Sequence, residues 1–195
     1  MATSLFQELE SQYQFYRKQG RNESCLGSLA TCDPSGQPRV RSVILHDIDE
    51  FTVLFLISRL HGKWSQIQSN PKAELLIWWP DALLQFRLTG KILEASERDA
   101  NDLWDKQNPK AKALDHALGD EFKPADPIES YDSLKAEVNR RSREKDLAPK
   151  PDHVVACRLE IDEIDRIKAS SEDRLHDRRL ARRSGDQWVE TQLVP

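Results

Sequence analysis

The chain lacks several features that would assign a protein quickly to a functional class. Its 195 residues contain no apolar run of the about 18 residues that a transmembrane helix needs. The N-terminus, M-A-T-S-L-F-Q-E-L-E, has neither the basic segment nor the apolar segment of a secretory signal. We therefore expect a cytoplasmic protein without a membrane partner.

Cysteine is scarce. Cys25, Cys32 and Cys157 are odd in number, and they show neither a Cys-x-x-Cys spacing nor a nearby histidine cluster. This usage suits a reducing cytosol and gives no zinc site. We expect each cysteine to be a buried free thiol, and we expect no bound metal.

An excess of basic charge is also absent, because 29 Lys and Arg residues face 33 Asp and Glu residues, for a net charge of −4. Nucleic-acid binding normally needs a basic footprint, so a nucleic-acid partner is not expected. No internal repeat or low-complexity segment is visible. The length suits one domain spanning residues 1–195, with a sizeable core.

The C-terminal stretch from Arg174 to Pro195 reads R-L-H-D-R-R-L-A-R-R-S-G-D-Q-W-V-E-T-Q-L-V-P. Its central Ser-Gly-Asp cluster favours a turn, so the stretch predicts a β-hairpin. In an extended chain, Arg174, His176 and Arg178 share one face. This strip either binds an anionic, planar ligand, because guanidinium groups match phosphate and carboxylate geometry, or is a charged edge strand that resists pairing.

The rest of the chain predicts a mainly β fold of the α+β kind. Helical spacing and capping signals predict helices over residues 4–19, 63–69, 96–107, 110–118 and 128–145. Apolar or alternating runs predict strands over residues 26–31, 38–47, 51–57, 73–79, 83–95, 153–161 and 164–169. Five or six antiparallel strands in succession favour a barrel over a parallel sheet, and Gly90 within one of them indicates a bulge.

Arg41 lies within a predicted strand, where an unpaired cation is costly. The strand over residues 51–57 leads into a helix that begins near Lys63. The free amides and the dipole of a helix N-terminus favour an anion. These features together predict a phosphate site.

The string R-L-H-D-R, the basic run after it, Trp188 and the terminal Leu193-Val194-Pro195 resemble the C-terminal signature of the pyridoxamine 5′-phosphate oxidase family. Members of that family are FMN-dependent homodimers with a split β-barrel fold. The resemblance extends over most of the chain from about Leu26 to the end. It implies an antiparallel FMN-binding split β-barrel with peripheral helices, and a homodimer with FMN at the subunit interface.

The same resemblance assigns site residues. The family's R-x-V-L-L-K strand is matched by R-S-V-I-L-H, its S-R-K before a helix by H-G-K, and its R-Q-V-x-V-x-G-K by L-Q-F-R-L-T-G-K. The implied FMN-binding residues are Arg41, Ser42, Val43, Ile44, His46, Lys63, Gln85 and Arg178, with Arg41 and Lys63 on the phosphate. An outward-facing Gln85 is the alternative for that residue. Arg174 and His176 are implied to contact substrate as the catalytic pair.

Departures from the family pattern lie mainly at the substrate end. His46 replaces a lysine that usually touches substrate, and Asn108 replaces the arginine of the R-P-x-x-S motif, whose serine position falls on Lys112. Lys110 and Lys112 restore charge there but not the planar guanidinium fork. Flavin binding is therefore expected to be robust, and oxidation of pyridoxamine phosphate weak or absent.

Two further departures concern the flavin itself. Gly62 removes one phosphate arginine, and the sequence leaves open whether Arg59 replaces it. The tryptophan that usually packs by the flavin is absent, and Ile167-Lys168 lies at that place.

The sequence thus predicts an FMN-dependent oxidoreductase, in which a small-molecule substrate gives a hydride to the flavin. One alternative is a non-catalytic FMN carrier or sensor. Another is a split-barrel interaction module that binds no ligand.

Overall fold

A computed structural model describes residues 4–20, 25–143, 147, 149–172 and 175–195 of the chain. The helices in these residues are α1 (Ser4–Lys18), α2 (Gly62–Ser69), the short 3₁₀ helix η2 (Pro80–Ala82), α3 (Glu97–Asp105), α4 (Pro109–Asp120) and α5 (Tyr131–Arg141). The strands are β1 (Leu26–Cys32), β2 (Pro38–Ile44), β3 (Asp47–Asp49), β4 (Thr52–Ser58), β5 (Lys72–Trp79), β6 (Leu84–Glu94), β7 (Val154–Lys168), β8 (Asp177–Ser184) and β9 (Gln187–Leu193).

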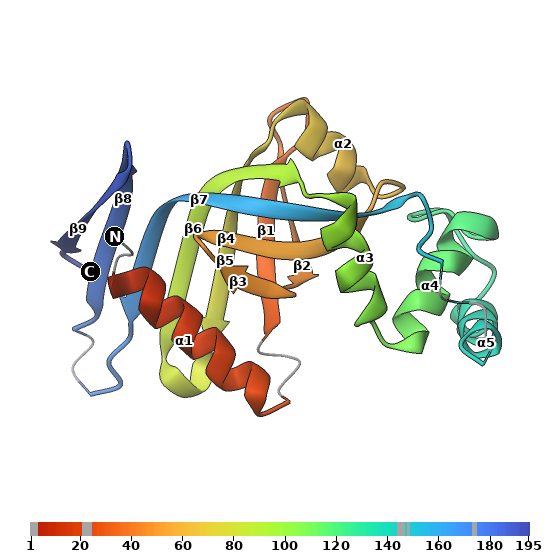
Figure 1. The fold of residues 1–195 in the computed structure, drawn as a ribbon, viewed down its shortest axis with the longest axis horizontal. Coiled ribbons are helices and arrows are strands. Elements are labelled where there is room, and N and C mark those ends of the chain that lie inside the picture. The colour runs from red at the N-terminus through yellow and green to blue at the C-terminus, as the bar shows by residue number, and fades with distance from the viewer. Residues whose placement is uncertain (1–3, 21–24, 144–146, 148, 173–174) are drawn as a thin grey trace.

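All nine strands belong to one antiparallel sheet that curls into an open barrel (Figure 1). Along its main path the strand order is β2-β1-β5-β6-β7-β4-β3. One edge of β7 pairs with β6, whereas the other edge pairs first with β4 and then, beyond residue 160, with β8. The sheet therefore splits along β7, and the tail hairpin β8–β9 extends away from the barrel.

The passage from β2 to β3 brings the two ends of the sheet together. The amide of Leu45 donates to the carbonyl of Cys25 at 2.7 Å, and the amide of His46 donates to the carbonyl of Leu54 on β4 at 2.8 Å. Consecutive residues thus bond to opposite ends of the curled sheet. This closure fixes the position of His46.

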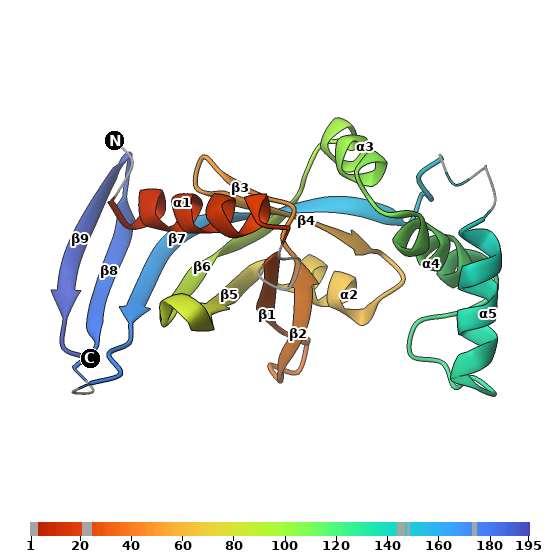
Figure 2. The ribbon, with the colours of Figure 1, turned by 90° about the horizontal axis from the view of Figure 1, so that it is seen from below.

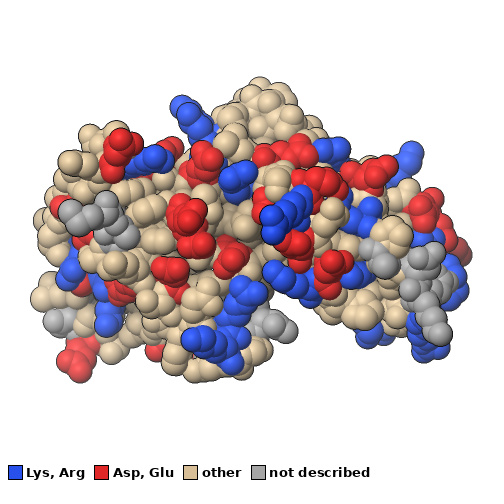
Figure 3. All heavy atoms as spheres, viewed as in Figure 1, with Lys and Arg blue, Asp and Glu red and all other residues tan. Residues whose placement is uncertain are grey.

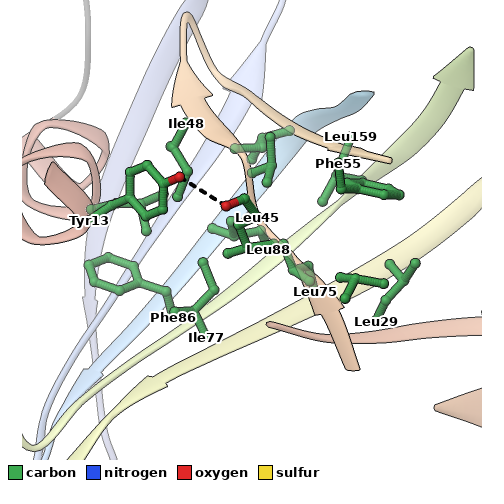
Figure 4. Close-up of a cluster of buried hydrophobic side chains, with 14 of the residues drawn as sticks. Tyr13, Leu29, Leu45, Ile48, Phe55, Leu75, Ile77, Phe86, Leu88 and Leu159 are labelled. Atoms are coloured by element: carbon green, nitrogen blue, oxygen red, sulfur yellow. Dashed lines mark hydrogen bonds between the residues drawn. The ribbon is translucent and has the colours of Figure 1, made fainter. Parts of the chain in front are cut away.

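Alternating side chains of the strands fill the barrel, as the period of two along a strand requires. Helix α1 lies across the sheet and adds Leu5, Phe6, Leu9, Tyr13 and Tyr16 to the same core (Figure 2). The hydroxyl of Tyr13 donates to the carbonyl of Leu45 at 3.0 Å inside this cluster (Figure 4). The helix therefore also holds the β2–β3 passage in place.

The predicted bulge at Gly90 is confirmed, because the register between β6 and β7 shifts between Thr89 and Gly90. A Cβ atom at Gly90 would lie 1.9 Å from the carbonyl oxygen of Glu160. Only glycine allows this close backbone approach.

The predicted tail hairpin is also confirmed, with Gly185 at φ 62° in its turn. Trp188 of β9 stacks on Phe51 with ring centroids 4.8 Å apart, and Phe51 contacts Phe6 of α1 at 4.3 Å. The side chain of Glu190 accepts a hydrogen bond from the Ser4 hydroxyl at 2.7 Å. The hairpin is thereby attached to α1 and to the β3–β4 turn.

Three strand predictions differ in detail from the structure. The predicted strands over residues 153–161 and 164–169 form one continuous strand, β7. Phe51 lies in a turn with φ 60° rather than in β4. The short strand β3 was not predicted. The described sheet has nine strands rather than five or six, because it includes β3 and the two strands of the tail hairpin.

Helices α3, α4 and α5 extend to one side of the barrel (Figure 1). Ser96 and Asp99 form a capping box at the start of α3, which covers the outer face of β4. The His153 ring lies 3.1 Å from the carbonyl of Asp115 and holds α4 against the start of β7. Among the described helices, none is long and apolar enough to cross a membrane.

Candidate functional site

A cleft of about 890 Å³ opens between the end of the barrel on one side and the α3–α4 connection and helix α4 on the other. The outline of the molecule is notched in this area (Figure 3). The volume lies in the range of small-molecule and cofactor sites. The lining includes residues from α1, the β2–β3 passage, the end of β4, the start of α2 and the α3–α4 connection, among them Arg17, Ser42, Val43, Ile44, His46, Ser58, His61, Lys63, Lys106, Asn108 and Asp115.

Arg41 lies beside the start of α2, where its guanidinium is held by neutral acceptors. It donates to the carbonyl of Leu29 at 3.2 Å, to the hydroxyl of Thr31 at 2.6 Å and to the side-chain oxygen of Gln66 at 2.6 Å. Burial and the neighbouring Arg39 lower the pKa of Arg41. These contacts orient the cation, and no carboxylate among the described residues forms an ion pair with it.

Lys63 lies in the first turn of α2 and lines the cleft. Burial lowers the pKa of its ammonium group and Arg41 lowers it further, whereas Asp115 acts in the opposite direction. None of the ion pairs found in the described part of the chain includes Arg41 or Lys63. A cationic corner thus forms where Lys63 and the N-terminus of α2 line the cleft and Arg41, which is not itself a lining residue, lies near Lys63. This arrangement suits an anion.

Asp115 projects from α4 into the same cleft. Burial raises the pKa of this carboxyl to about 6, and Lys63 opposes the shift. The carboxyl thus titrates close to neutral pH beside the cationic corner.

Gln85 and Arg178 do not line the cleft, although the sequence assigns them to the same cofactor. Gln85 on β6 is directly opposite Ile167 on β7, and Ile167 is directly opposite Arg178 on β8. Directly paired residues point to the same face of a sheet. The three side chains therefore form one row on the outer face, and Trp78 of β5, 45% exposed, continues it.

Arg178 has a carboxylate partner within the chain. Its Nε and Nη2 atoms donate to the two oxygens of Asp165 at 3.1 Å and 2.8 Å. Arg87 lies 3.4 Å from Asp165 and pairs with Glu74 at 2.6 Å. Arg178 therefore has a counter-charge within the chain, because Asp165 approaches it from the neighbouring strand.

The predicted catalytic pair is only partly described. Arg174 lies outside the described residues. His176 precedes β8, and its Nδ1 atom accepts a hydrogen bond from the amide of Ser170 at 3.2 Å. It lies next to the outer-face row and outside the cleft.

Residues that differ from the family pattern near the expected substrate position have structural roles in this chain. The side chain of Asn108 caps α4 by accepting from the amide of Ala111 at 3.0 Å. The Lys112 ammonium lies over the Trp104 ring at 5.4 Å, and neither Lys112 nor Lys110 lines the cleft. Arg59 pairs with Glu94 at 2.5 Å and also lies outside the cleft.

Sequence reasoning missed two cations of the cleft, Arg17 at the end of α1 and Lys106 after α3. They belong to no motif, and only the fold brings them to His46. Burial lowers the pKa of His46, and Arg17 and Lys106 lower it further.

The curled antiparallel sheet with peripheral helices places the chain in the class of FMN-binding split β-barrels. The sequence model of the family described as pyridoxamine 5′-phosphate oxidase matches residues 17–141. The chain therefore belongs to the pyridoxamine 5′-phosphate oxidase family, whose members bind FMN.

Known relatives support this placement. Over 167 residues the chain is 30% identical to the pyridoxine/pyridoxamine 5′-phosphate oxidase of Rubrobacter xylanophilus, covering 86% of this chain and 76% of the relative. A relative with the same name in Maricaulis maris is 30% identical over 184 residues, covering 92% and 80%.

Two solved structures share the fold. PhzG of Burkholderia lata, in complex with tetrahydrophenazine-1-carboxylic acid, has a TM-score of 0.82 and 24% identity, covering 100% of this chain and 98% of that one. An FMN-binding protein related to pyridoxamine 5′-phosphate oxidase from Nostoc punctiforme has a TM-score of 0.78 and 18% identity, covering 100% of both chains.

Proposed function

We propose that this chain is an FMN-dependent oxidoreductase whose cleft binds the cofactor. The observation that carries the proposal is the cationic corner formed by Arg41, Lys63 and the start of α2. Both cations are half-buried, and a partly desolvated cation without a carboxylate partner is costly. One phosphate group would compensate both of them at once. The corner thus fits the phosphate end of FMN, and Ser42, Val43, Ile44 and His46 extend along the cleft beside it.

When bound, FMN supplies the redox chemistry by accepting a hydride from a small substrate and passing the electrons to dioxygen or another acceptor. The residues of the chain bind and orient the cofactor, and the cleft wall formed by the α3–α4 connection and α4 limits the access of water. The guanidinium of Arg41 is preoriented by Thr31 and Gln66, so little side-chain entropy is lost when the phosphate binds.

We further propose that two copies of the chain form a homodimer, with each FMN between them. The predicted flavin residues fall into two groups on one chain, those of the cleft and the outer-face row of Gln85, Ile167 and Arg178. A second copy can bring its row to the cleft of the first. The partly exposed Trp78 next to this row suits burial at such an interface.

A second candidate, a non-catalytic FMN carrier or sensor, is favoured by the substrate end of the cleft. Asn108 is occupied as a helix cap and Lys112 lies on Trp104, so the family's phosphate-binding arginine and serine have no equivalents there. We expect oxidation of pyridoxamine 5′-phosphate to be weak or absent.

Two measurements test the proposal. The purified chain, reconstituted with FMN, should show a bound-flavin absorbance band near one flavin per chain. Flavin reduction by amines, alcohols and nicotinamide donors, together with oxygen consumption, then separates enzyme from carrier. A chain that does not bind FMN contradicts the proposal. Turnover of pyridoxamine 5′-phosphate on the order of 1 per second or more contradicts only the expectation that oxidation of this substrate is weak or absent.

A further inference from the structure

A second group of cation-capable side chains lines the cleft apart from the Arg41–Lys63 corner. It consists of Arg17 from the end of α1, His46 from the β2–β3 passage and Lys106 from the segment after α3. Three segments distant in the sequence thus supply one group each to a single surface of the cleft.

Contacts show that the three groups lie together. The Nη1 atom of Arg17 donates to the carbonyl of His46 at 2.9 Å, which places the guanidinium beside the histidine. Arg17 and Lys106 both influence the titration of the His46 ring, whereas Lys63 is influenced by Arg41 and Asp115. The cleft therefore has two separate cationic clusters.

The charge available in the second cluster is modest. Arg17 is partly compensated by Asp47, whose carboxylate lies 3.7 Å away, and both side chains are over 40% exposed. Lys106 takes part in none of the ion pairs found among the described residues. Burial holds the His46 ring in its neutral form. Between one and two positive charges thus face the ligand.

This charge and these donors match a carboxylate better than a phosphate. A carboxylate carries one negative charge, whereas a phosphate monoester carries about −1.5 to −2 at pH 7. The remaining N–H groups of Arg17 match the two oxygens of a carboxylate, and the Lys106 ammonium supplies the compensating charge. Asn108, which stands at a family arginine position, adds no cation because it caps α4.

We propose that Arg17, His46 and Lys106 form a subsite that binds a carboxylate group of the substrate. The inference rests on the proposed function, because it assigns the substrate class of the same FMN cleft. The cleft thus has two anion positions, one at Arg41 and Lys63 for the cofactor and one at Arg17, His46 and Lys106 for the substrate.

The test uses three planar probes on the FMN-loaded protein in isothermal titration calorimetry: benzoate, the neutral benzamide and phenyl phosphate. We expect benzoate to bind at least about tenfold more tightly than benzamide, since one charge-assisted hydrogen bond gives about one decade of affinity. Benzoate should also bind more tightly than phenyl phosphate. Arg17→Gln and Lys106→Gln should each remove most of the preference for benzoate over benzamide.

Lys110→Gln is the matched control, because this lysine lies near Lys106 in the chain but outside the cleft, and it should keep the preference. Equal binding of benzoate and benzamide, tighter binding of phenyl phosphate, or an unchanged preference in Lys106→Gln overturns the subsite. FMN content is measured by absorbance on the same samples. A natural chain that retains flavin but shows no preference for benzoate over benzamide contradicts the subsite alone, whereas a chain that takes up no FMN contradicts the proposed function and the subsite with it.

Discussion

The predicted flavin residues lie in two regions, the cleft and the outer face of the sheet, and the cations of these regions have different partners. Next to the cleft, Arg41 is held by a carbonyl, a hydroxyl and an amide oxygen. Lys63, which lines the cleft, has no carboxylate within ion-pair distance among the described residues. On the outer face, Arg178 and Arg87 share Asp165, which is only 4% exposed. Cations of the first kind are available to an external anion, whereas those of the second kind stabilise the sheet. We expect substitutions in the cleft to lower ligand affinity, and substitutions at Asp165 to lower stability.

The largest effect is expected for the double substitution Arg41→Ala/Lys63→Ala. Each residue should contribute a charge-assisted bond of about 1.5 to 3 kcal/mol to the FMN phosphate. The double variant should therefore bind FMN at least about a hundredfold more weakly, as measured by quenching of flavin fluorescence. Arg39→Ala is the control, since Arg39 lies on the same strand as Arg41 but pairs with Asp33 of the β1–β2 turn. This variant should keep the FMN affinity of the natural chain. Unchanged FMN affinity in the double variant would show that Arg41 and Lys63 do not bind the FMN phosphate.

A smaller effect, on stability, is expected for Asp165→Asn. The neutral amide leaves Arg87 and Arg178 without their shared carboxylate and loses charge-assisted hydrogen bonds in a buried position. The free energy of unfolding should fall by about 2 kcal/mol, as measured by urea denaturation of the FMN-free protein. The free energy of unfolding of the Lys63→Ala variant should fall by much less in the same assay. A larger loss of stability in Lys63→Ala than in Asp165→Asn would contradict the assignment of Asp165 to stability and of Lys63 to ligand binding.

The raised pKa of Asp115, a residue of the cleft, should make the free energy of unfolding of the chain depend on pH. Its pKa is raised to about 6 in the folded chain, above the unfolded value of about 3.9. The folded state therefore binds more protons between these values, and stability should fall as pH rises from about 4 to about 6, by about 1 to 2 kcal/mol.

The Asp115→Asn variant isolates this contribution. Its stability relative to the natural chain should increase across that pH window and then stay constant. The carboxyls of Asp99 and Asp177 have lowered pKa values, so their contributions are lost below this window. Burial lowers the pKa values of His46, His61 and His153, so these groups make stability rise with pH below about 6.5, and their contribution cancels in the difference between the variant and the natural chain. A difference between variant and natural chain that is flat with pH would show that Asp115 titrates normally.

The smallest effect is expected for Arg59→Ala. Arg59 pairs with Glu94 outside the cleft, and both side chains are over 40% exposed, so the pair is worth at most about 1 kcal/mol of stability. FMN affinity should change by less than about twofold, which is about 0.4 kcal/mol. A larger loss of affinity would show that Arg59 reaches the phosphate in place of the arginine missing at Gly62.

Local patterns in the sequence were sufficient to predict most strands, the tail hairpin and the bulge at Gly90. They depend on alternation, turn residues and capping, all of which act over a few positions. The continuity of β7 was missed, because Asp162 and Glu163 read as an interruption. In the structure these residues lie where β7 changes partner from β4 to β8.

The candidate site was predictable only where a motif carried it. The motifs gave Arg41 and Lys63, which the fold brings to one corner. They could not show that Gln85 and Arg178 lie in a separate row, because this depends on the register of three strands far apart in the sequence. Arg17, Lys106 and Asp115 lie on helices or in a connection, and only tertiary packing places them in the cleft.

The most direct test of an FMN site shared between two subunits is to mix two variants of the chain, each with a different part of the proposed site damaged. Arg41→Ala/Lys63→Ala damages the cleft, and Gln85→Ala/Arg178→Ala damages the outer-face row. Neither homodimer should retain FMN. After the two are unfolded and refolded together, heterodimers should regain one intact site each, or about a quarter of all sites, as measured by bound-flavin absorbance after gel filtration. Absence of flavin in the mixture, or full flavin retention by the outer-face variant alone, would contradict a site built from two copies of the chain.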